Sequence, residues 1–256
     1  MSRLIPALFV LGIMSVCLAA SARVAGAQGA NRAEYPPLFF REDWKFDKTA
    51  PNVNDEREPE HVPVPGDLVN PNLELKLYGD KAGMRAVLQP YNRDIVYMMS
   101  LLTTSNWAAT LRDKNNDVDL SGLATVRWST RQAGFHLLRP ILKLANGKWL
   151  MGDKTSALTT DFVETEFNLA DVRWRELDIT NIVGGREAKW LDNPDLSRVE
   201  EIGFTDLMRG AGHGSGGGSR IDWIQVTGKP ILRATAPPVT PAAPTTAPGR
   251  GGRGRQ

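Results

Sequence analysis

Short runs of four to ten apolar, β-branched and aromatic residues recur between residues 73 and 227, each bounded by Gly, Pro, Asn or Asp. Runs of this length and composition are typical of β-strands. No stretch of this region keeps apolar residues at helical spacing for three turns. The predicted strands are Leu73–Tyr78, Ile95–Leu102, Trp107–Arg112, Ala124–Arg131, Phe135–Leu144, Lys148–Met151, Phe162–Leu169, Trp174–Ile179, Val199–Leu207 and Arg220–Thr227.

The regular spacing of these runs predicts an all-β fold, an antiparallel β-sandwich of jelly-roll type. A hairpin is expected around Asn146 and Gly147, since Asn-Gly readily supplies the positive φ angles of a type I′ turn. The best helical candidate, Thr180–Trp190, is interrupted by two adjacent glycines, so at most one or two short turns are expected there. The polar segment Thr49–Pro71 indicates a long surface loop.

The first 27 residues have the pattern of a cleaved secretory signal: Arg3, an apolar stretch from Leu4 to Ala20, and small residues up to Ala27. A membrane anchor is the alternative, but Pro6 and Gly12 interrupt the apolar stretch, which is short for a bilayer. We therefore expect an exported protein, periplasmic or extracellular, with no membrane span after cleavage.

The predicted organisation is a signal peptide over residues 1–27, an extension and loop over 28–71, a β-sandwich over 72–230 and a disordered tail over 231–256. A strand within 38–46 is an alternative start of the sandwich. From Ala234 the tail consists of Ala, Pro, Thr, Gly and Arg, apart from Val239 and the final Gln. Such a composition cannot bury enough surface to offset the entropy of ordering.

The composition of the chain argues against several kinds of site and partner. The single cysteine, Cys17, lies in the predicted signal, so the mature chain has no disulfide, thiolate zinc site or cysteine nucleophile. Between Gln28 and Gly228 there are 24 Lys and Arg against 29 Asp and Glu, a formal charge of −5. A mildly acidic domain argues against nucleic acid as its main partner.

A family likeness appears near the end of the domain. It is carried by the Trp-bearing strand Val172–Ile179, by Pro194–Asp206 with its Asp-Leu-Ser-Arg-Val and Ile-Gly-Phe, and by the closing strand Ile221–Val226. This order resembles the galactose-binding-like jelly rolls, which include the family 11 carbohydrate-binding modules and the complex I intermediate-associated protein family. That superfold carries sugar binding, protein binding and scaffolding alike. The entry Phe39–Trp44 is similar to that of exported bacterial proteins.

The resemblance also implies a structural calcium ion near the first and last strands, with Glu42, Asp43 and Asp222 as candidate ligands, although their spacing matches no calcium loop. No other cofactor is expected. The three histidines are widely separated and have no metal-binding spacing. They are His61, His136 and His213.

Seven tryptophans make stacking on sugar rings a candidate function. Trp107, Trp149 and Trp190 lie beside polar residues at expected strand edges or in loops, and both sugar stacking and core packing are open for them. Trp128 and Trp223 alternate with apolar neighbours, so both are expected to face the core.

Basic residues suggest the kind of ligand. The fourth predicted strand places Arg127 and Arg131 on its outward face. If Arg139 and Lys143 on the next strand share that face, four cations surround His136 or its neighbours. They could then hold carboxylate or sulfate groups of an acidic polysaccharide. A merely solvated face is the alternative.

Catalysis has weaker support. Two acid pairs share strand faces, Glu164 with Glu166 and Asp117 with Asp119, but same-face acids occur on any solvated strand. No Gly-x-Ser-x-Gly or His-Glu-x-x-His motif is present. The leading hypothesis is a secreted, non-catalytic module that binds a polysaccharide or glycan, with an acidic polysaccharide as the candidate ligand. The alternatives are a glycan-acting hydrolase or lyase, and a protein-binding surface or assembly domain.

Overall fold

The computed structural model of the chain describes residues 34–54, 58–89, 95–100, 102–183, 189–208 and 217–233. The predicted signal peptide, the tail from residue 234, His213 and the glycine pair of the helical candidate lie outside these residues. Within the described ranges there is no α-helix, and hence no helix long and apolar enough to cross a lipid bilayer. The helical turns in these ranges are the 3₁₀ helices η1 (Pro65–Asp67), η2 (Lys81–Gly83) and η3 (Leu169–Asp171).

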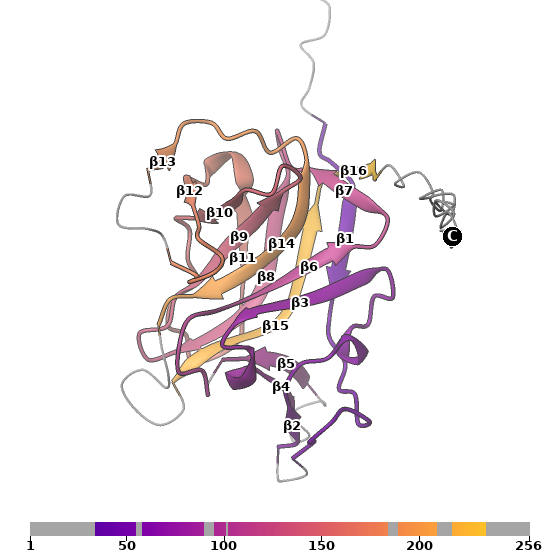
Figure 1. The fold of residues 1–256 in the computed structure, drawn as a ribbon, viewed down its shortest axis with the longest axis vertical. Coiled ribbons are helices and arrows are strands. Elements are labelled where there is room, and N and C mark those ends of the chain that lie inside the picture. The colour runs from indigo at the N-terminus through magenta and orange to yellow at the C-terminus, as the bar shows by residue number, and fades with distance from the viewer. Residues whose placement is uncertain are drawn as a thin grey trace, which may run out of the picture. The chain divides into compact units, whose positions relative to one another are not determined.

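The strands form two sheets that pack face to face (Figure 1). Sheet A contains, in spatial order, β11 (Val163–Asn168), β8 (Thr125–Ala133), β15 (Gly218–Thr227), β5 (Ile95–Met99), β4 (Arg85–Gln89) and β2 (Glu60–His61), and β1 (Leu38–Glu42) pairs with β15. Sheet B contains β13 (Trp190–Leu191), β12 (Trp174–Glu176), β10 (Trp149–Gly152), β9 (Leu138–Leu144), β14 (Val199–Asp206), β6 (Trp107–Asp113) and β3 (Leu73–Gly79). Beside these, β7 (Asn116–Asp119) pairs with β14 and with β16 (Lys229–Leu232).

The connections between the strands confirm the predicted fold class, an antiparallel β-sandwich of jelly-roll type. From β5 onward the chain crosses to the other sheet after every one, two or three strands. All neighbouring strands named above pair antiparallel. Each predicted strand overlaps an observed one, whereas β2, β4, β7, β13 and β16 come from segments without a predicted strand.

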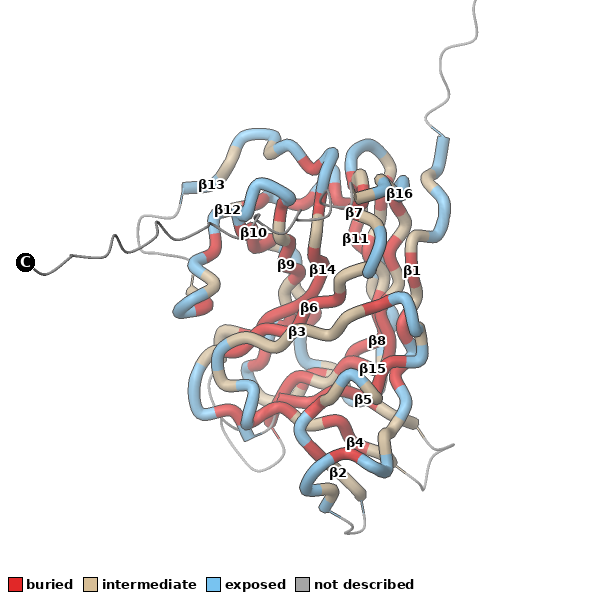
Figure 2. Tube along the Cα trace, turned by 45° about the vertical axis from the view of Figure 1, so that its right-hand side comes forward, coloured by how far each residue is buried: buried red, intermediate tan, exposed pale blue. Residues whose placement is uncertain are grey.

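The core lies between the sheets because apolar residues alternate along the strands. On β14, Ile202 and Phe204 are buried in the main core cluster, whereas Glu201 and Thr205 point to the opposite face. Trp128 on β8 is fully buried in the same cluster, as its alternation predicts. Figure 2 shows buried segments running along the strands of both sheets, with exposed segments at the connections.

The hairpin between β9 and β10 is confirmed, but its predicted turn type is wrong. Gly147 has a φ of 87°, whereas Asn146 is not among the residues with positive φ. The backbone N–H of Leu144 donates to the carbonyl oxygen of Lys148 at 2.8 Å, and that of Gly147 donates to Leu144 at 2.9 Å. A type I′ turn needs positive φ at both central residues, so this is a three-residue loop with glycine in the left-handed position.

A bulge in β15 corrects the prediction for Trp223. Ile221 pairs with Thr130 and Trp223 with Ser129, so the register between β15 and β8 shifts at the residue in between. The extra residue reverses the alternation and places Trp223 on the outer face of sheet A. There the guanidinium carbon of Arg41 lies 4.0 Å from the centre of its ring.

The last two strands connect the sheets directly. Only Gly228 separates β15 of sheet A from β16 of sheet B. A Cβ atom at this position would lie 2.5 Å from a side-chain carbon of Val118 and 2.9 Å from one of Leu120. Glycine therefore allows the chain to pass close to the core as it changes sheets.

Candidate functional site

Strands β9, β10, β12 and β13 lie together at one end of sheet B (Figure 1). The outer face of the sheet carries a group of arginines at this end. Arg173 and Arg175 are two residues apart on an extended segment, so their side chains share this face. Arg175 pairs with Trp190 on the edge strand β13. The strand on the other side of Arg175 is β10, and the next strand after β10 is β9, which carries Arg139. We call Arg139, Arg173, Arg175 and Trp190 the arginine patch.

Trp190 is the accessible aromatic residue of this patch, and 43% of its surface is exposed. The guanidinium carbons of Arg173 and Arg175 lie 4.5 Å and 5.6 Å from the centre of its ring. Trp190 also lines a pocket of about 440 Å³, together with residues 120–122, 170–173 and 191–194 and with Leu196. The site therefore combines charged hydrogen-bond donors, which lie over the indole, with the part of the indole surface that stays exposed.

The arginines of the patch form no ion pair with a carboxylate among the described residues. Among the described residues, no carboxylate oxygen lies within 4.0 Å of a side-chain nitrogen of Arg139, Arg173 or Arg175. Burial lowers the pKa of Arg139, and the charge of Arg175 lowers it further, while Asp153 and Asp206 offset part of this effect. Partly buried guanidinium groups that repel one another create a local potential that attracts anions.

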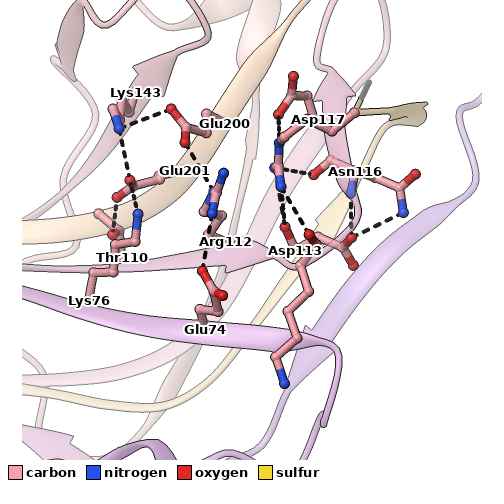
Figure 3. A network of polar contacts seen from close by, with 12 residues as sticks. Glu74, Lys76, Thr110, Arg112, Asp113, Asn116, Asp117, Lys143, Glu200 and Glu201 are labelled. Atoms are coloured by element: carbon pink, nitrogen blue, oxygen red, sulfur yellow. Dashed lines mark hydrogen bonds and ion pairs between the residues drawn. The ribbon is translucent and has the colours of Figure 1, made fainter. Parts of the chain in front are cut away.

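A second region of the same face has the opposite arrangement (Figure 3). The side chain of Glu201 on β14 is fully buried. One of its oxygens accepts hydrogen bonds from Lys76 Nζ at 2.7 Å and Lys143 Nζ at 3.2 Å. The other accepts from Thr110 Oγ1 at 2.7 Å and Tyr78 Oη at 2.8 Å. We call these five residues the Glu201 network.

The Glu201 network is electrostatically satisfied. Burial alone would raise the pKa of Glu201, but hydrogen bonds from Lys76, Thr110 and Tyr78 outweigh it and lower the pKa below its ordinary value. The pKa of Lys143 is raised, because hydrogen bonds to Glu200 and Glu201 outweigh the opposing effect of its burial. The hydrogen bonds of Glu201 join β14 to β3, β6 and β9. Because its carboxylate already accepts from four donors, it has no remaining charge to offer a ligand.

The middle of the outer face is apolar and is covered by the chain itself. Trp149 and Met151 form a buried cluster there with Ile182, which is 0% exposed and comes from the segment after β12. The side-chain amide of Asn106 fixes this segment by donating to the carbonyl oxygen of Ile182 at 2.9 Å. Trp149 is 9% exposed and packs edge-on against Tyr78, with 5.1 Å between the ring centres.

No protein-family model matches this chain, and no curated protein matches its sequence. Among solved structures, the family 11 carbohydrate-binding module from Clostridium thermocellum in complex with a β-1,3-1,4-mixed-linked tetrasaccharide is 12% identical, covers 74% of this chain and 96% of that chain, and has a TM-score of 0.35. The Emp47p carbohydrate recognition domain is also 12% identical, with 69% and 97% coverage and a TM-score of 0.30. The agarase AgWH50C has the same identity and TM-score, with 79% and 25% coverage. At TM-scores this low the likeness carries no inference about function, and the ligand has to be inferred from this chain's own side chains.

The structure separates the three tryptophans proposed as sugar platforms. Trp107 is 1% exposed and packs in the main core against Phe204, with 6.0 Å between the ring centres. Trp149 is buried in the apolar cluster of the outer face. For both indoles the packing alternative therefore holds, and their candidate role as ligand-binding residues is wrong. Trp190 is the one of the three that a ligand can reach.

The single basic face expected from the sequence does not form. Arg127 and Arg131 lie on β8 in sheet A, whereas Arg139 and Lys143 lie on β9 in sheet B, because the chain crosses between the sheets after β8. Arg127 is ion-paired with Glu164. Lys143 belongs to the Glu201 network.

His136 does not lie at a basic surface either. Its side chain is fully buried, and its Nδ1 contacts a carboxylate oxygen of Asp206. The hydroxyl of Ser219 donates to the same oxygen at 2.6 Å. This buried group joins the β8–β9 connection to β14 and β15.

The candidate calcium ligands are engaged elsewhere. Glu42 is fully buried and accepts hydrogen bonds from the backbone N–H groups of Trp44, Val69 and Asn70. Asp43 is ion-paired with Arg41 at 2.6 Å. The pKa of Asp222 is raised above its ordinary value, because the effect of burial exceeds the opposing effect of a hydrogen bond with Ser129. Within the described ranges, no three His, Asp or Glu side chains are grouped so that they could hold a metal ion.

Asp117, Asp119 and Glu164, three of the acids considered for catalysis, have structural partners. Asp117 accepts from Arg198 Nε and Arg233 Nε, each at 2.8 Å. Asp119 accepts from the backbone N–H of Ser121 at 2.9 Å. Glu164 is paired with Arg127, and Glu166 is exposed on β11. None of these contacts orients two carboxylates toward one reacting bond.

Sequence reasoning missed Arg173 and Arg175. Their signal is the alternation Arg173-Trp174-Arg175, in which Trp174 enters the core and the arginines take the outer face. The two-residue strand β13 was too short to recognise, so nothing in the sequence connected these arginines to Trp190.

Proposed function

We propose that this protein binds an anionic carbohydrate through the arginine patch. The observation that carries the proposal is the group of three arginines that have no carboxylate partner among the described residues, two of which lie over the ring of an exposed tryptophan. The face of an indole matches the C–H face of a pyranose ring. A guanidinium group forms paired hydrogen bonds with a carboxylate or a sulfate ester.

The position of each residue in the arginine patch suggests its role in binding the ligand. Trp190 supplies the stacking surface on the edge strand, where a chain ligand can approach from solvent. Arg173 and Arg175 lie over the ring and contact the charged substituents of a sugar that stacks on the part of the ring left exposed. Arg139 lies further along the sheet and contacts the next charged group. The protein acts by binding, outside the cytoplasm if the signal-like N-terminus directs export.

The test is a calorimetric titration of the full chain with three probes: polygalacturonate oligomers, dextran sulfate and neutral dextran. We expect binding to an anionic probe, no binding to neutral dextran, and affinity that falls with added salt because surface charges are screened. Arg175→Gln should weaken binding by about tenfold or more, the worth of a charge-assisted hydrogen bond. Lys81→Gln is the matched control, since it removes the same charge from an exposed residue outside the patch.

The aromatic half of the site has its own control. Trp190→Ala should weaken binding about as much as Arg175→Gln, whereas Leu232→Ala, at a residue that is 76% exposed, should leave it unchanged. Equal affinities of Arg175→Gln and Lys81→Gln would overturn the proposal, and so would an absence of binding to both anionic probes. Release of reducing ends from either probe would replace it with a glycan-acting enzyme.

A further inference from the structure

The pocket that Trp190 lines borders the arginine patch, because Arg173 and Trp190 belong to both. Three connecting segments form its walls: the β7–β8 turn, η3 with the residues that follow it, and the segment between β13 and β14. The backbone N–H of Leu120 donates to the carbonyl oxygen of Leu196 at 2.9 Å and joins the first of these segments to the third. The volume of about 440 Å³ is in the range of small-ligand sites.

The inner surface of this pocket is apolar and its rim is polar. Leu120, Val172 and Leu196 line the pocket and are buried in the main core cluster. Asp171 and Asp192 line it as well, and both are exposed. An apolar floor with hydrogen-bonding groups at the rim suits a sugar ring, because the C–H face packs on the floor while the hydroxyl groups meet the rim.

The charge of the rim is opposite to that of the arginine patch. Among the described residues, no side-chain nitrogen of Lys, Arg or His lies within 4.0 Å of a carboxylate oxygen of Asp171 or Asp192. Ionised carboxylates accept hydrogen bonds and donate none. The rim therefore favours the hydroxyl groups of a neutral sugar and repels a sugar that carries a carboxylate or sulfate.

We infer that the pocket is a second subsite, for a neutral sugar, and that the ligand is a polysaccharide in which acidic and neutral sugars are neighbours. This inference rests on the proposed function, since it names the class of anionic carbohydrate that the arginine patch binds. The acidic sugar stacks at Trp190, and the next sugar enters the pocket with its hydroxyl groups toward Asp171 and Asp192. A polymer of acidic sugars alone places a negative charge beside these carboxylates and binds less tightly.

The test compares two tetrasaccharides in calorimetric titrations of the full chain. A hyaluronan tetrasaccharide carries a carboxylate on every second sugar, whereas tetragalacturonate carries one on every sugar. Charge alone favours tetragalacturonate at the arginine patch. The pocket should reverse this order and make the hyaluronan tetrasaccharide bind about tenfold more tightly. Equal affinities, or tighter binding of tetragalacturonate, would overturn the inference.

Because these probes also differ in their linkages, two variants isolate the charge of the rim. Asp171→Asn and Asp192→Asn each keep the size of the side chain and one oxygen acceptor but lose the charge. Each should raise the affinity for tetragalacturonate about threefold without strengthening the binding of the hyaluronan tetrasaccharide. Glu166→Gln is the matched control, because it removes the same charge from an exposed residue of sheet A, and it should leave both affinities unchanged.

The variants also separate a failure of this inference from a failure of the proposed function. If Arg175→Gln weakens the binding of both tetrasaccharides while the natural chain does not prefer hyaluronan, the arginine patch stands and the neutral subsite is wrong. The subsite is equally wrong if neither aspartate variant gains affinity for tetragalacturonate, or if Glu166→Gln gains as much. If the natural chain binds neither tetrasaccharide, the proposed function fails and this inference fails with it.

Discussion

On the outer face of sheet B, Glu201 lies fully buried among four donors, whereas Arg175, three strands away, lies near another arginine and has no carboxylate partner among the described residues. Both regions are built from alternating strand positions on one sheet. They differ in whether the chain itself neutralises the charge. A buried carboxylate must be compensated for the fold to form, whereas an uncompensated, partly exposed arginine near the sheet edge costs little stability and remains available to a ligand.

The largest effect is expected from removing the centre of the Glu201 network. Glu201→Ala leaves Lys76 and Lys143 without their shared carboxylate and the Tyr78 hydroxyl without its acceptor. The free energy of unfolding should fall by about 3 kcal/mol, measured by urea denaturation. Glu164→Ala, which removes an exposed ion pair, should cost about 0–1 kcal/mol. Equal losses in the two variants would show that the Glu201 network is no more structural than a surface pair.

A smaller effect should appear in the dependence of stability on pH. The pKa of Glu201 is lower in the folded chain than in the unfolded chain, so the folded chain releases this proton more readily. The resulting stabilisation is present above the unfolded pKa of about 4.3 and is lost as pH falls through the folded value. The stability difference between the natural chain and Glu201→Gln should therefore narrow in urea denaturations from about pH 6 to about pH 3. A constant difference would contradict this role of the charge.

The smallest effect on stability is expected in the arginine patch. Arg175→Met keeps the apolar stem and removes the repulsion with Arg139. The free energy of unfolding should stay the same or rise by about 0.5 kcal/mol, because like-charge contacts on a sheet are mildly destabilising. A loss above about 1 kcal/mol in urea denaturation would place Arg175 in the fold and not in a ligand site.

The sequence predicted the fold class because the alternation of apolar and polar residues is a local property of each strand. It misplaced Trp223 because one bulged residue reverses that alternation, and nothing in the local pattern marks the bulge. β4 was missed since its short apolar run directly precedes the polar segment from Pro90 to Asp94.

The candidate site was harder to predict than the fold. The predicted basic face was wrong because a binding site depends on which strands share a sheet. Strands β8 and β9 follow one another in the sequence but lie in different sheets. Trp190 was identified from its polar neighbour in the sequence. Its partners Arg173 and Arg175 required the pairing of β12 with β13, which is a tertiary fact.

The passage of the chain through Gly228 has a mechanical consequence. β16 is hydrogen-bonded to β7, and Arg233 at its end donates to Asp117 at 2.8 Å and to the carbonyl oxygen of Asn116 at 2.8 Å. A pulling force applied through the C-terminal end of the chain therefore acts first on the hydrogen bonds of β16 and Arg233 to β7. The tension reaches β15 and the other strands of sheet A only after these bonds have broken.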